Sequence, residues 1–373
     1  MRASPSLFLA FVVLVVLLPS GLGAVHGQMV FDVGKGWDSY IVYRPCILYN
    51  GSLFMMWYSG SDSNQIDGIG LATSKDGIAW TRYSGNPVMT RGQSGSWDFG
   101  GVNDQWVMFE GGGYKMWFTS RASPDASLWQ IGYATSPDGI HWSKYSSNPV
   151  LTPNATSWDA KDVDMPTVIH NGSGYTMYYL GSSDKPGSVA FNPHVGIATS
   201  LDGVHWTKIG TERTVSIPFG NGWDGGSNWD YLTSVSFQNG SYVGFYSSMY
   251  DSHYYMSGPV QNAALNSQIG MATSSDGIHW IPNANNPIIS YGSGSWDQNG
   301  IETPMTIIVG NQFYVYFTAQ SSSARRIGLA ILPATLPVPE FPTALLVLST
   351  SMIAVLLCLQ MRRKKPSCVT SSS

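Results

Sequence analysis

Apolar and small residues alternate along four nearly identical stretches of the chain. They read IGLATSKDGIAW from Ile69, IGYATSPDGIHW from Ile131, VGIATSLDGVHW from Val195 and IGMATSSDGIHW from Ile269. The first half of each stretch alternates with a period of two residues, which predicts a β-strand. Asp-Gly then predicts a tight turn into another strand, because glycine accepts a positive φ and aspartate can bond nearby backbone N–H groups. A fifth copy, IGLAILP from Ile327, ends before the turn.

A second hairpin is predicted upstream of each stretch. In the third unit it consists of a strand over 164–169, a turn over 170–174 and a strand over 175–180. The other units align without gaps on the aromatic residue that opens the second of these strands: Phe54, Tyr114, Tyr175, Tyr242 and Phe313. Two hairpins make a four-stranded antiparallel unit. Such units repeating every ~60 residues predict blades arranged around an axis.

A Trp-Asp pair precedes every unit and fixes the number of blades. The five pairs begin at Trp37, Trp97, Trp158, Trp223 and Trp296. The fifth unit lacks its fourth strand, whereas Met29-Val30-Phe31 forms a spare strand before the first unit. The sequence therefore predicts an all-β fold, a five-bladed β-propeller of four-stranded antiparallel blades. The N-terminal strand completes the fifth blade, which removes an exposed sheet edge.

Composition agrees with a turn-rich β protein and excludes some partners. Of the 373 residues, 11% are charged and 13% aromatic, with 41 glycines and a net charge of −4. Nothing is basic enough to indicate binding to nucleic acid, so we expect none.

The two ends of the chain differ from the propeller, which we assign to residues 28–333. Residues 1–27 have a positive start, an apolar core and small residues, which is typical of a signal peptide; an uncleaved membrane anchor is the alternative. Residues 334–342 form a Pro-rich stalk and residues 343–360 an apolar run near the length of a transmembrane helix. The basic tail over 361–373 is expected to stay in the cytoplasm, which places the propeller outside the cell as a membrane-anchored surface protein.

The stalk contains Pro339-Glu340-Phe341-Pro342, which resembles the archaeal PEF-type sorting signals. In that family the tail is cut off and replaced by a lipid anchor. A plain membrane protein with one C-terminal span predicts the same topology. Four N-glycosylation sequons are candidates for modification, although Asn-Gly at three of them is also what a hairpin turn requires; they begin at Asn50, Asn154, Asn171 and Asn239.

Candidate chemistry lies where the repeat is broken. Three histidines recur at equivalent places in the Asp-Gly hairpins, which indicates surface positions of the scaffold. By contrast, the residue at the start of the innermost strand varies between blades, and this position lies near the axis. Acids gathered there would push one another's pKa values apart, as general acid–base chemistry requires; the candidates are Asp104, Asp164, Asp230 and Glu302.

Other polar and aromatic residues near this end of the axis are candidates for binding a sugar, by hydrogen bonds or by stacking. They are Tyr43, Arg44, Asn103, Trp106, Trp129, His194, Trp229, Tyr231 and His253. Blade packing is the alternative for each aromatic side chain. We expect no cofactor; a Ca²⁺ ion in an acid-rich channel is conceivable, but no ligand spacing in the sequence supports it.

Residues 28–333 resemble the five-bladed propeller glycosidases in the pattern W-D, P-x-x-x, [YF]-x-M-W-Y, IGxATSxDGIxW and NPV. This group contains arabinanases, xylosidases, invertases, levansucrases and mannoside phosphorylases. In its hydrolases one carboxylate comes from the first blade, a modulating Asp from a middle blade and an acid Glu from a later blade. The resemblance implies Asp164 as the modulator or base and Glu302 as the general acid. The first blade has Tyr43-Arg44-Pro45 and no acid there, so Asp104 or Asp230 would have to supply the remaining carboxylate.

Two functions follow from these expectations. The first is a glycoside hydrolase that acts on an oligo- or polysaccharide at the cell surface. The second is a non-catalytic propeller that binds glycans or another surface partner and has lost the first-blade carboxylate.

Overall fold

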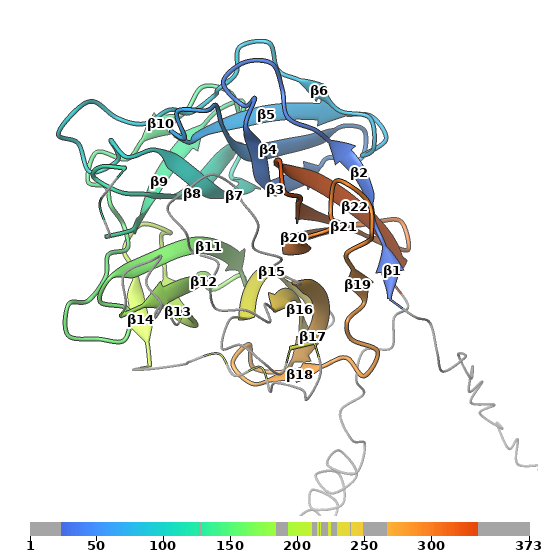
Figure 1. Ribbon diagram of the computed structural model, residues 1–373. Helices are drawn as coiled ribbons and strands as arrows, with labels where there is room; N and C mark the ends of the chain where they lie inside the picture. Colours follow the sequence, from blue (N-terminus) through green and yellow to red (C-terminus); the bar gives the residue numbers. More distant parts are fainter. Residues whose placement is uncertain are drawn as a thin grey trace, which may run out of the picture.

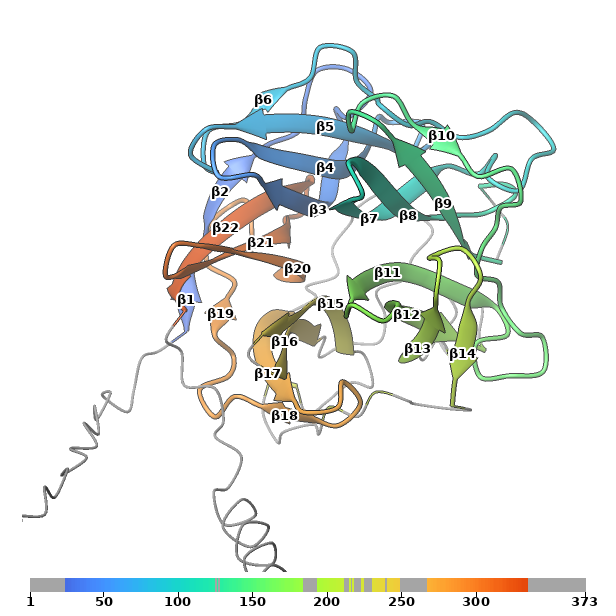
Figure 2. The same cartoon turned by 180° about the vertical axis from the view of Figure 1, so that it is seen from behind.

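Five β-sheets stand side by side around a central axis in the computed structural model (Figures 1 and 2). The structure describes residues 24–124, 126, 128–183, 193–210, 215, 217, 223–224, 230–238, 240–248 and 267–334. The predicted all-β, five-bladed propeller is confirmed within them. The first three blades are four-stranded and antiparallel: β3 (Ile41–Tyr49), β4 (Phe54–Ser61), β5 (Gly68–Ser74) and β6 (Thr81–Arg82); β7 (Val102–Glu110), β8 (Gly113–Ser120), β9 (Gln130–Ser136) and β10 (Ser143–Lys144); β11 (Asp162–His170), β12 (Tyr175–Ser182), β13 (His194–Ser200) and β14 (Thr207–Ile209).

The last two blades use strands from both ends of the described chain. Blade 4 contains β15 (Asp230–Gln238), β16 (Ser241–Ser248), β17 (Gln268–Ser274) and β18 (Trp280–Pro282), and it is extended by β19 (Ile289–Ser290) and β1 (Val25–His26). Blade 5 contains β20 (Gly300–Val309), β21 (Gln312–Gln320) and β22 (Arg325–Pro333). Its fourth strand is β2 (Gln28–Phe31), which pairs antiparallel with β22. The prediction that the N-terminal strand closes the ring is therefore confirmed, and pairing begins even before residue 28.

The Asp-Gly turns are held by their own side chains, as the sequence predicted. In blade 1, Asp76 Oδ1 accepts hydrogen bonds from the backbone N–H groups of Ile78 and Ala79, and Ser74 Oγ accepts one from that of Gly77. Gly77 has a φ of 75°, a conformation that other residues rarely adopt. The histidines of the other three turns are exposed and contact the turn aspartate, so they belong to the scaffold; they are His141, His205 and His279.

Each Asp-Gly turn also ties its blade to the preceding one. The glycine carbonyl accepts a hydrogen bond from an aromatic side chain on the second strand of the neighbouring blade: Trp57 to Gly139, Trp117 to Gly203, Tyr178 to Gly277 and Tyr316 to Gly77. Blade 4 has Phe245 at this position, which carries no donor. Its neighbour, blade 5, has no Asp-Gly turn because β2 replaces the strand that would follow the turn.

The Trp-Asp pairs brace the entry to each innermost strand, as expected. Asp38, for example, accepts hydrogen bonds from Tyr58 and Arg82 of its own blade, and Trp37 stacks on Tyr58. Asp98 and Asp159 pair in the same way with lysines of their outermost strands. We name the end of the ring where the innermost strands begin the acid face, and the end with the hairpin and Asp-Gly turns the hairpin face.

Several predictions about the chain ends concern residues outside the described part. They are the apolar run over 343–360, the basic tail, the stalk after Ala334 and residues 1–23 of the signal segment. Among the described residues, no helix is long and apolar enough to cross a membrane.

Candidate functional site

A bulge at the start of the innermost strands positions the candidate site. Four residues there adopt a left-handed conformation with φ near +50°, although none is a glycine; they are Arg44, Asp104, Met165 and Thr303. Their backbone N–H groups turn toward the preceding blade and donate to a hydroxyl on its second strand. The acceptors are Thr318, Ser59, Thr119 and Ser247 in that order. Strained backbone of this kind costs about 1–3 kcal/mol per residue and persists where the surroundings fix it.

Blade 4 shows why these hydroxyls matter. At the equivalent acceptor position blade 3 has Leu180, which cannot accept a hydrogen bond. The facing residue of blade 4, Leu232, instead pairs with Tyr246 in the ladder. The ring of hydrogen bonds from bulge N–H groups to hydroxyls is therefore interrupted between blades 3 and 4, where the two facing side chains are apolar, although blade 4 still has a register shift after Leu232.

The bulges bring four predicted or neighbouring carboxyl groups to the axis at the acid face. Asp104, Asp164 and Glu302 lie there as expected, and Asp162 joins them two residues before Asp164 on the same side of β11. All four are at most 7% exposed. Both side-chain oxygens of Asp162 and Oδ1 of Asp164 have no hydrogen-bond partner among the described residues.

Burial raises the pKa of every one of these groups, because a buried charge loses its hydration. The pKa of Glu302 rises to about 7; nearby Arg44 opposes the rise and Asp104 adds to it. The pKa values of Asp162 and Asp164 rise well above the usual range, through burial and through the charges of neighbouring aspartates. Because Asp104 influences all of the others, the carboxyl groups form one electrostatic cluster.

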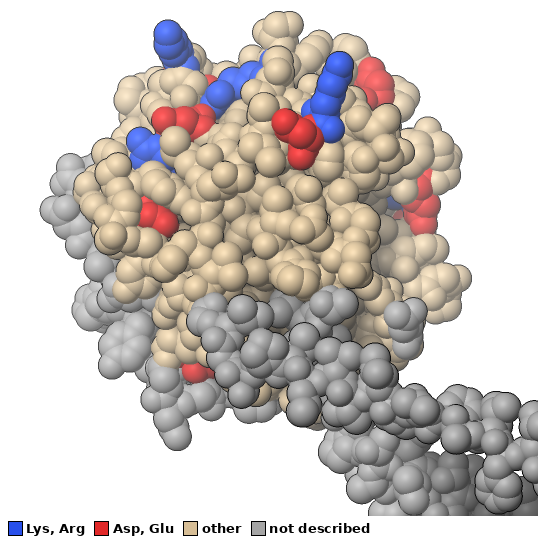
Figure 3. Space-filling model, turned by 90° about the vertical axis from the view of Figure 1, so that its right-hand side faces the viewer, with Lys and Arg blue, Asp and Glu red and all other residues tan. Residues whose placement is uncertain are grey.

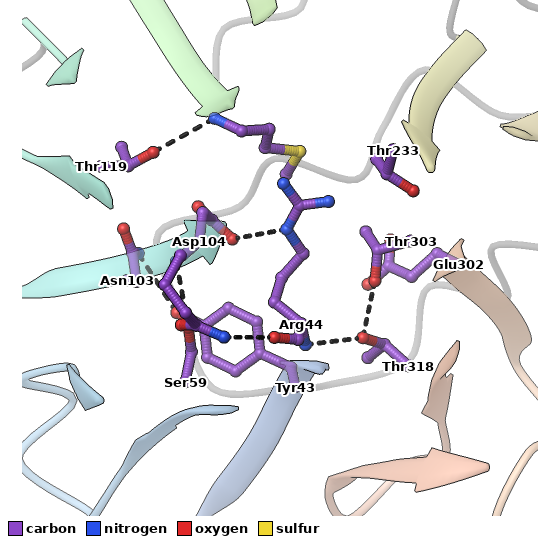
Figure 4. A network of polar contacts seen from close by, with 12 residues as sticks. Tyr43, Arg44, Ser59, Asn103, Asp104, Thr119, Thr233, Glu302, Thr303 and Thr318 are labelled. Carbon is purple, nitrogen blue, oxygen red and sulfur yellow. Dashed lines mark hydrogen bonds and ion pairs between the residues drawn. The ribbon is translucent and has the colours of Figure 1, made fainter. Parts of the chain in front are cut away.

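Two arginines partly neutralise this cluster. Arg44 extends from the bulge of β3 into the space between Asp104 and Glu302 (Figure 4). Its Nε lies 3.2 Å from Asp104 Oδ1, and both side chains are buried. Arg325, at the start of β22, places its Nε 3.8 Å from Glu302 Oε1. Burial still raises the pKa of Asp104, although Arg44 and Arg325 oppose the rise.

The start of the innermost strand in blade 1 has no acid, as the sequence indicated, but a loop of the same blade brings a carboxylate to the cluster. Asp67 lies in the loop between β4 and β5, and its carbonyl oxygen accepts a hydrogen bond from the N–H of Val102 in blade 2. Asn103 Nδ2 donates to both Asp67 Oδ2, at 3.3 Å, and the Tyr43 hydroxyl, at 3.1 Å. Burial and the charge of Asp104 raise the pKa of Asp67 to about 7. Asp67 is only half-buried, unlike the other four carboxyl groups.

Only a weak sequence signal pointed to Asp67. The loop residue before the third strand bonds the next innermost strand in three blades, through Asp67, Trp129 and Ser267. Only Asp67 among them is ionisable. Because this residue lies in a loop of variable length, alignment of the strands did not draw attention to it.

The structure places the predicted binding residues, and the catalytic candidate Asp230, in different surroundings. Tyr43, Arg44 and Asn103 lie in the cluster. Trp106 is buried and packs in a hydrophobic cluster, which agrees with the alternative of blade packing, and its part in a sugar site stays a prediction. Trp129 is half-buried under the Arg121 guanidinium, and His194 packs against Trp158. Asp230 and Tyr231 begin β15 as expected, whereas Trp229 and His253 lie outside the described residues.

The sequons occupy turns, and modification remains a prediction. Asn50, Asn154 and Asn171 are exposed, and each Oδ1 accepts a hydrogen bond from a backbone N–H two residues on. Their Nδ2 atoms, which a glycan would occupy, take no part in these turns. Asn239 lies outside the described residues.

No set of three or more potential ligands in the described part of the chain is arranged to hold a metal ion. The described charges on the side shown in Figure 3 are scattered, with both signs interspersed. The site's own chemistry is that of several proton-holding carboxyl groups beside two guanidinium groups. Such a site can donate a proton and accept another near neutral pH.

Comparison with known proteins shows the fold. No family model matches the chain. An uncharacterized protein of Mycobacterium tuberculosis, Rv1502, is 27% identical over 161 residues, 41% of this chain and 50% of that protein; the chain spans about half the length of the curated relatives it matches. A structure described as a glycoside hydrolase has a TM-score of 0.64 at 16% identity, covering 84% of this chain and 94% of that chain. Another structure has a TM-score of 0.58 at 17% identity and covers 87% of this chain and 97% of that chain. Its description reads that the GH130 family of mannoside phosphorylases contains glycoside hydrolases that target beta-1,2 mannosidic linkages in Candida mannan. The chain thus shares its five-bladed fold with glycoside hydrolases and phosphorylases.

Proposed function

We propose that this protein hydrolyses a glycosidic bond at the acid face of its propeller. The observation that carries the proposal is the cluster of five carboxyl groups from four different blades, at the axis of a fold shared with glycoside hydrolases. Glycoside hydrolysis needs one carboxyl group that is protonated and one that is ionised, on either side of the bond that breaks.

The two groups with a pKa near 7 suit these roles. Glu302 is the general acid, because a pKa of about 7 leaves it a proton in a large share of the molecules near neutral pH, which it can give to the leaving oxygen. Asp67 is the base, because it is the least buried of the five and its pKa is matched to the operating pH. Asp164 keeps its role as the modulator. Asp104, paired with Arg44, provides negative charge for the developing oxocarbenium ion.

The location of the enzyme is part of this proposal. Residues 343–360 anchor the chain in a membrane, and the basic tail keeps its C-terminus in the cytoplasm. The propeller then faces the outside of the cell, where polysaccharide substrates are found.

A second function, glycan binding without catalysis, is favoured by one observation. The start of the innermost strand in blade 1 reads Tyr43-Arg44-Pro45, without the acid that the resembling hydrolases have in their first blade, and the Arg44 guanidinium engages Asp104. A site with that pair could bind hydroxyl groups of a sugar without turning it over.

The test is a screen of residues 28–333 against aryl glycosides and polysaccharides. Glu302→Gln and Asp67→Asn are expected to abolish turnover while the fold is retained. Asp62→Asn, in the same loop as Asp67, is the matched control and should leave turnover unchanged. Binding without turnover, unaffected by either variant of the cluster, would reject hydrolysis in favour of glycan binding.

A further inference from the structure

The hairpin face carries a ring of exposed apolar side chains that the proposed activity does not use. Each innermost strand ends at this face, and four blades place a large apolar residue at the same position near the end. They are Tyr49, Phe109, Phe237 and Ile308, exposed by 36%, 58%, 48% and 40%. Leu201, in the Asp-Gly turn of blade 3, is 87% exposed on the same face.

Contacts within each hairpin cover only one side of these side chains. Tyr49 contacts Phe54 across its hairpin at 4.1 Å between ring centroids, and Phe109 contacts Tyr114 at 4.9 Å. In blade 3 the same position is His170, which packs on Tyr175 in the same way at 4.7 Å. A polar aromatic ring can therefore make the same contact within the hairpin as an apolar one. Apolar residues in four of five blades indicate that the outer side of the ring also avoids water.

The described chain ends at this face. β22 runs from the acid face to Pro333, and the N–H of Ala334 donates to the carbonyl oxygen of Asn311, in the turn directly after Ile308's strand. Residues 334–342 then separate the propeller from the apolar run over 343–360. Even fully extended as polyproline, nine residues reach only about 28 Å. The stalk therefore leaves from the edge of the apolar ring and is short compared with the propeller.

Several charged groups on this face are paired, which lowers the cost of bringing it to a lipid surface. Glu110 lies 2.5 Å from Lys115 Nζ and 2.8 Å from His170 Nδ1. Three of the four Asp-Gly turn aspartates contact a histidine at 2.7–2.8 Å.

We propose that the hairpin face rests on the membrane that holds the 343–360 span, with the ring of Tyr49, Phe109, Phe237 and Ile308 in the headgroup region. Aromatic and branched apolar side chains are favourable at that depth, because one side meets lipid and the other remains packed on the protein. The acid face then points away from the membrane toward substrate. This inference rests on the proposed membrane anchor, and it adds a fixed orientation to it.

Glycans would conflict with this arrangement. Asn50 and Asn171 lie in the turns of the hairpin face, so a glycan at either would hold the face away from the lipid. The proposal requires both to be unmodified in the native protein, which mass spectrometry of its peptides can establish. A glycan on Asn50 or Asn171 would overturn it.

The direct test uses the full chain in vesicles of phosphatidylcholine and phosphatidylglycerol. Cys358→Ser and Cys368→Ser remove the accessible thiols, and Cys46 is buried. A nitroxide is attached in turn to Phe109→Cys and Ile308→Cys on the hairpin face. The control is Asn64→Cys, an exposed position in the loop between β4 and β5 on the acid face.

For each label we compare its relaxation by oxygen, which concentrates in lipid, with its relaxation by a water-soluble nickel complex. The ratio of the two is expected to be at least several-fold higher for the labels at 109 and 308 than for the label at 64. Resistance of the chain to carbonate extraction is measured on the same vesicles. Labels on both faces that are equally accessible to the nickel complex, in a chain that resists extraction, would refute the docked face but leave the anchor intact. Release of the chain by carbonate would reject both.

Discussion

Glu302 offers a quantitative test of the buried acid cluster. Its carboxyl group is 7% exposed, and burial raises its pKa from 4.5 to about 7. An unfolded chain therefore ionises this group first as the pH rises. Between pH 4.5 and about 7 the folded protein holds the extra proton, so the stability contributed by the protonated group is lost as pH rises through that window.

The magnitude follows from the difference between the two pKa values. Raising the pKa from 4.5 to about 7 corresponds to about 3 kcal/mol of stability lost above pH 7 relative to low pH. Glutamine has nearly the same shape and does not ionise. We expect Glu302→Gln and the original protein to be similarly stable at pH 4, and the variant to be about 3 kcal/mol more stable at pH 8.

The assay is thermal unfolding of residues 28–333 at both pH values. For a domain of about 300 residues, a change of about 3 kcal/mol shifts the Tm by roughly 5 °C. Glu110→Gln is the matched control with the opposite sign. Burial raises the pKa of Glu110, but hydrogen bonds from Lys115 and Tyr175 outweigh burial and lower it. The stability that ionised Glu110 contributes is therefore present at pH 8 and is lost as the pH falls.

A Glu302→Gln variant that is less stable than the original protein at pH 8 would refute the reasoning. That result would mean that Arg44 and Arg325 stabilise the ionised carboxylate by more than burial penalises it. A difference in Tm that is the same at both pH values would refute it as well.

Three further predictions concern the ring and the site. Thr119→Val removes the acceptor for the partly buried N–H of Met165 and is expected to cost about 1 kcal/mol in denaturant unfolding; an unchanged midpoint would contradict the role of the hydroxyl groups that accept from the bulges. Asp67→Asn is expected to lower turnover of an aryl glycoside by about 10²–10⁴-fold, with Asp62→Asn near the original rate; equal rates for the two variants would exclude Asp67 as the base. Deletion of residues 28–31 leaves β22 with an open edge, so the propeller should lose Tm and associate in size-exclusion chromatography; a monomer of unchanged Tm would argue against closure by β2.

Much of the scaffold could be predicted because its causes are local. The strands follow from alternation, the turns from Asp-Gly, and the number of blades from the repeat. Closure by the N-terminal strand was also readable, since one unit lacked a strand and the start of the chain had one to spare. Even the exception at Phe245 has a local correlate, because the next blade has no Asp-Gly turn to receive a hydrogen bond.

The site was predicted only in part. Alignment identified Asp164 and Glu302 because they occupy a position that the repeat defines. It gave Trp106 as a candidate for a sugar site or for blade packing, and only the structure showed that this side chain is buried in a hydrophobic cluster. It missed Asp162, which lies one strand period from Asp164, and Asp67, whose loop has no counterpart of fixed length in the other blades.

The sequence by itself determined the β-strands, their turns, the five blades and the order in which they close. Only the tertiary structure decided which charged groups meet. Arg44 and Asp104 are distant in sequence and come from neighbouring blades, and Asp67 reaches the cluster through a loop that bonds the next blade. The physical reason is that turn chemistry and alternation act over a few residues. The burial and mutual repulsion that raise the pKa values of Asp67 and Glu302 arise only when the closed ring brings the starts of separate innermost strands to one axis.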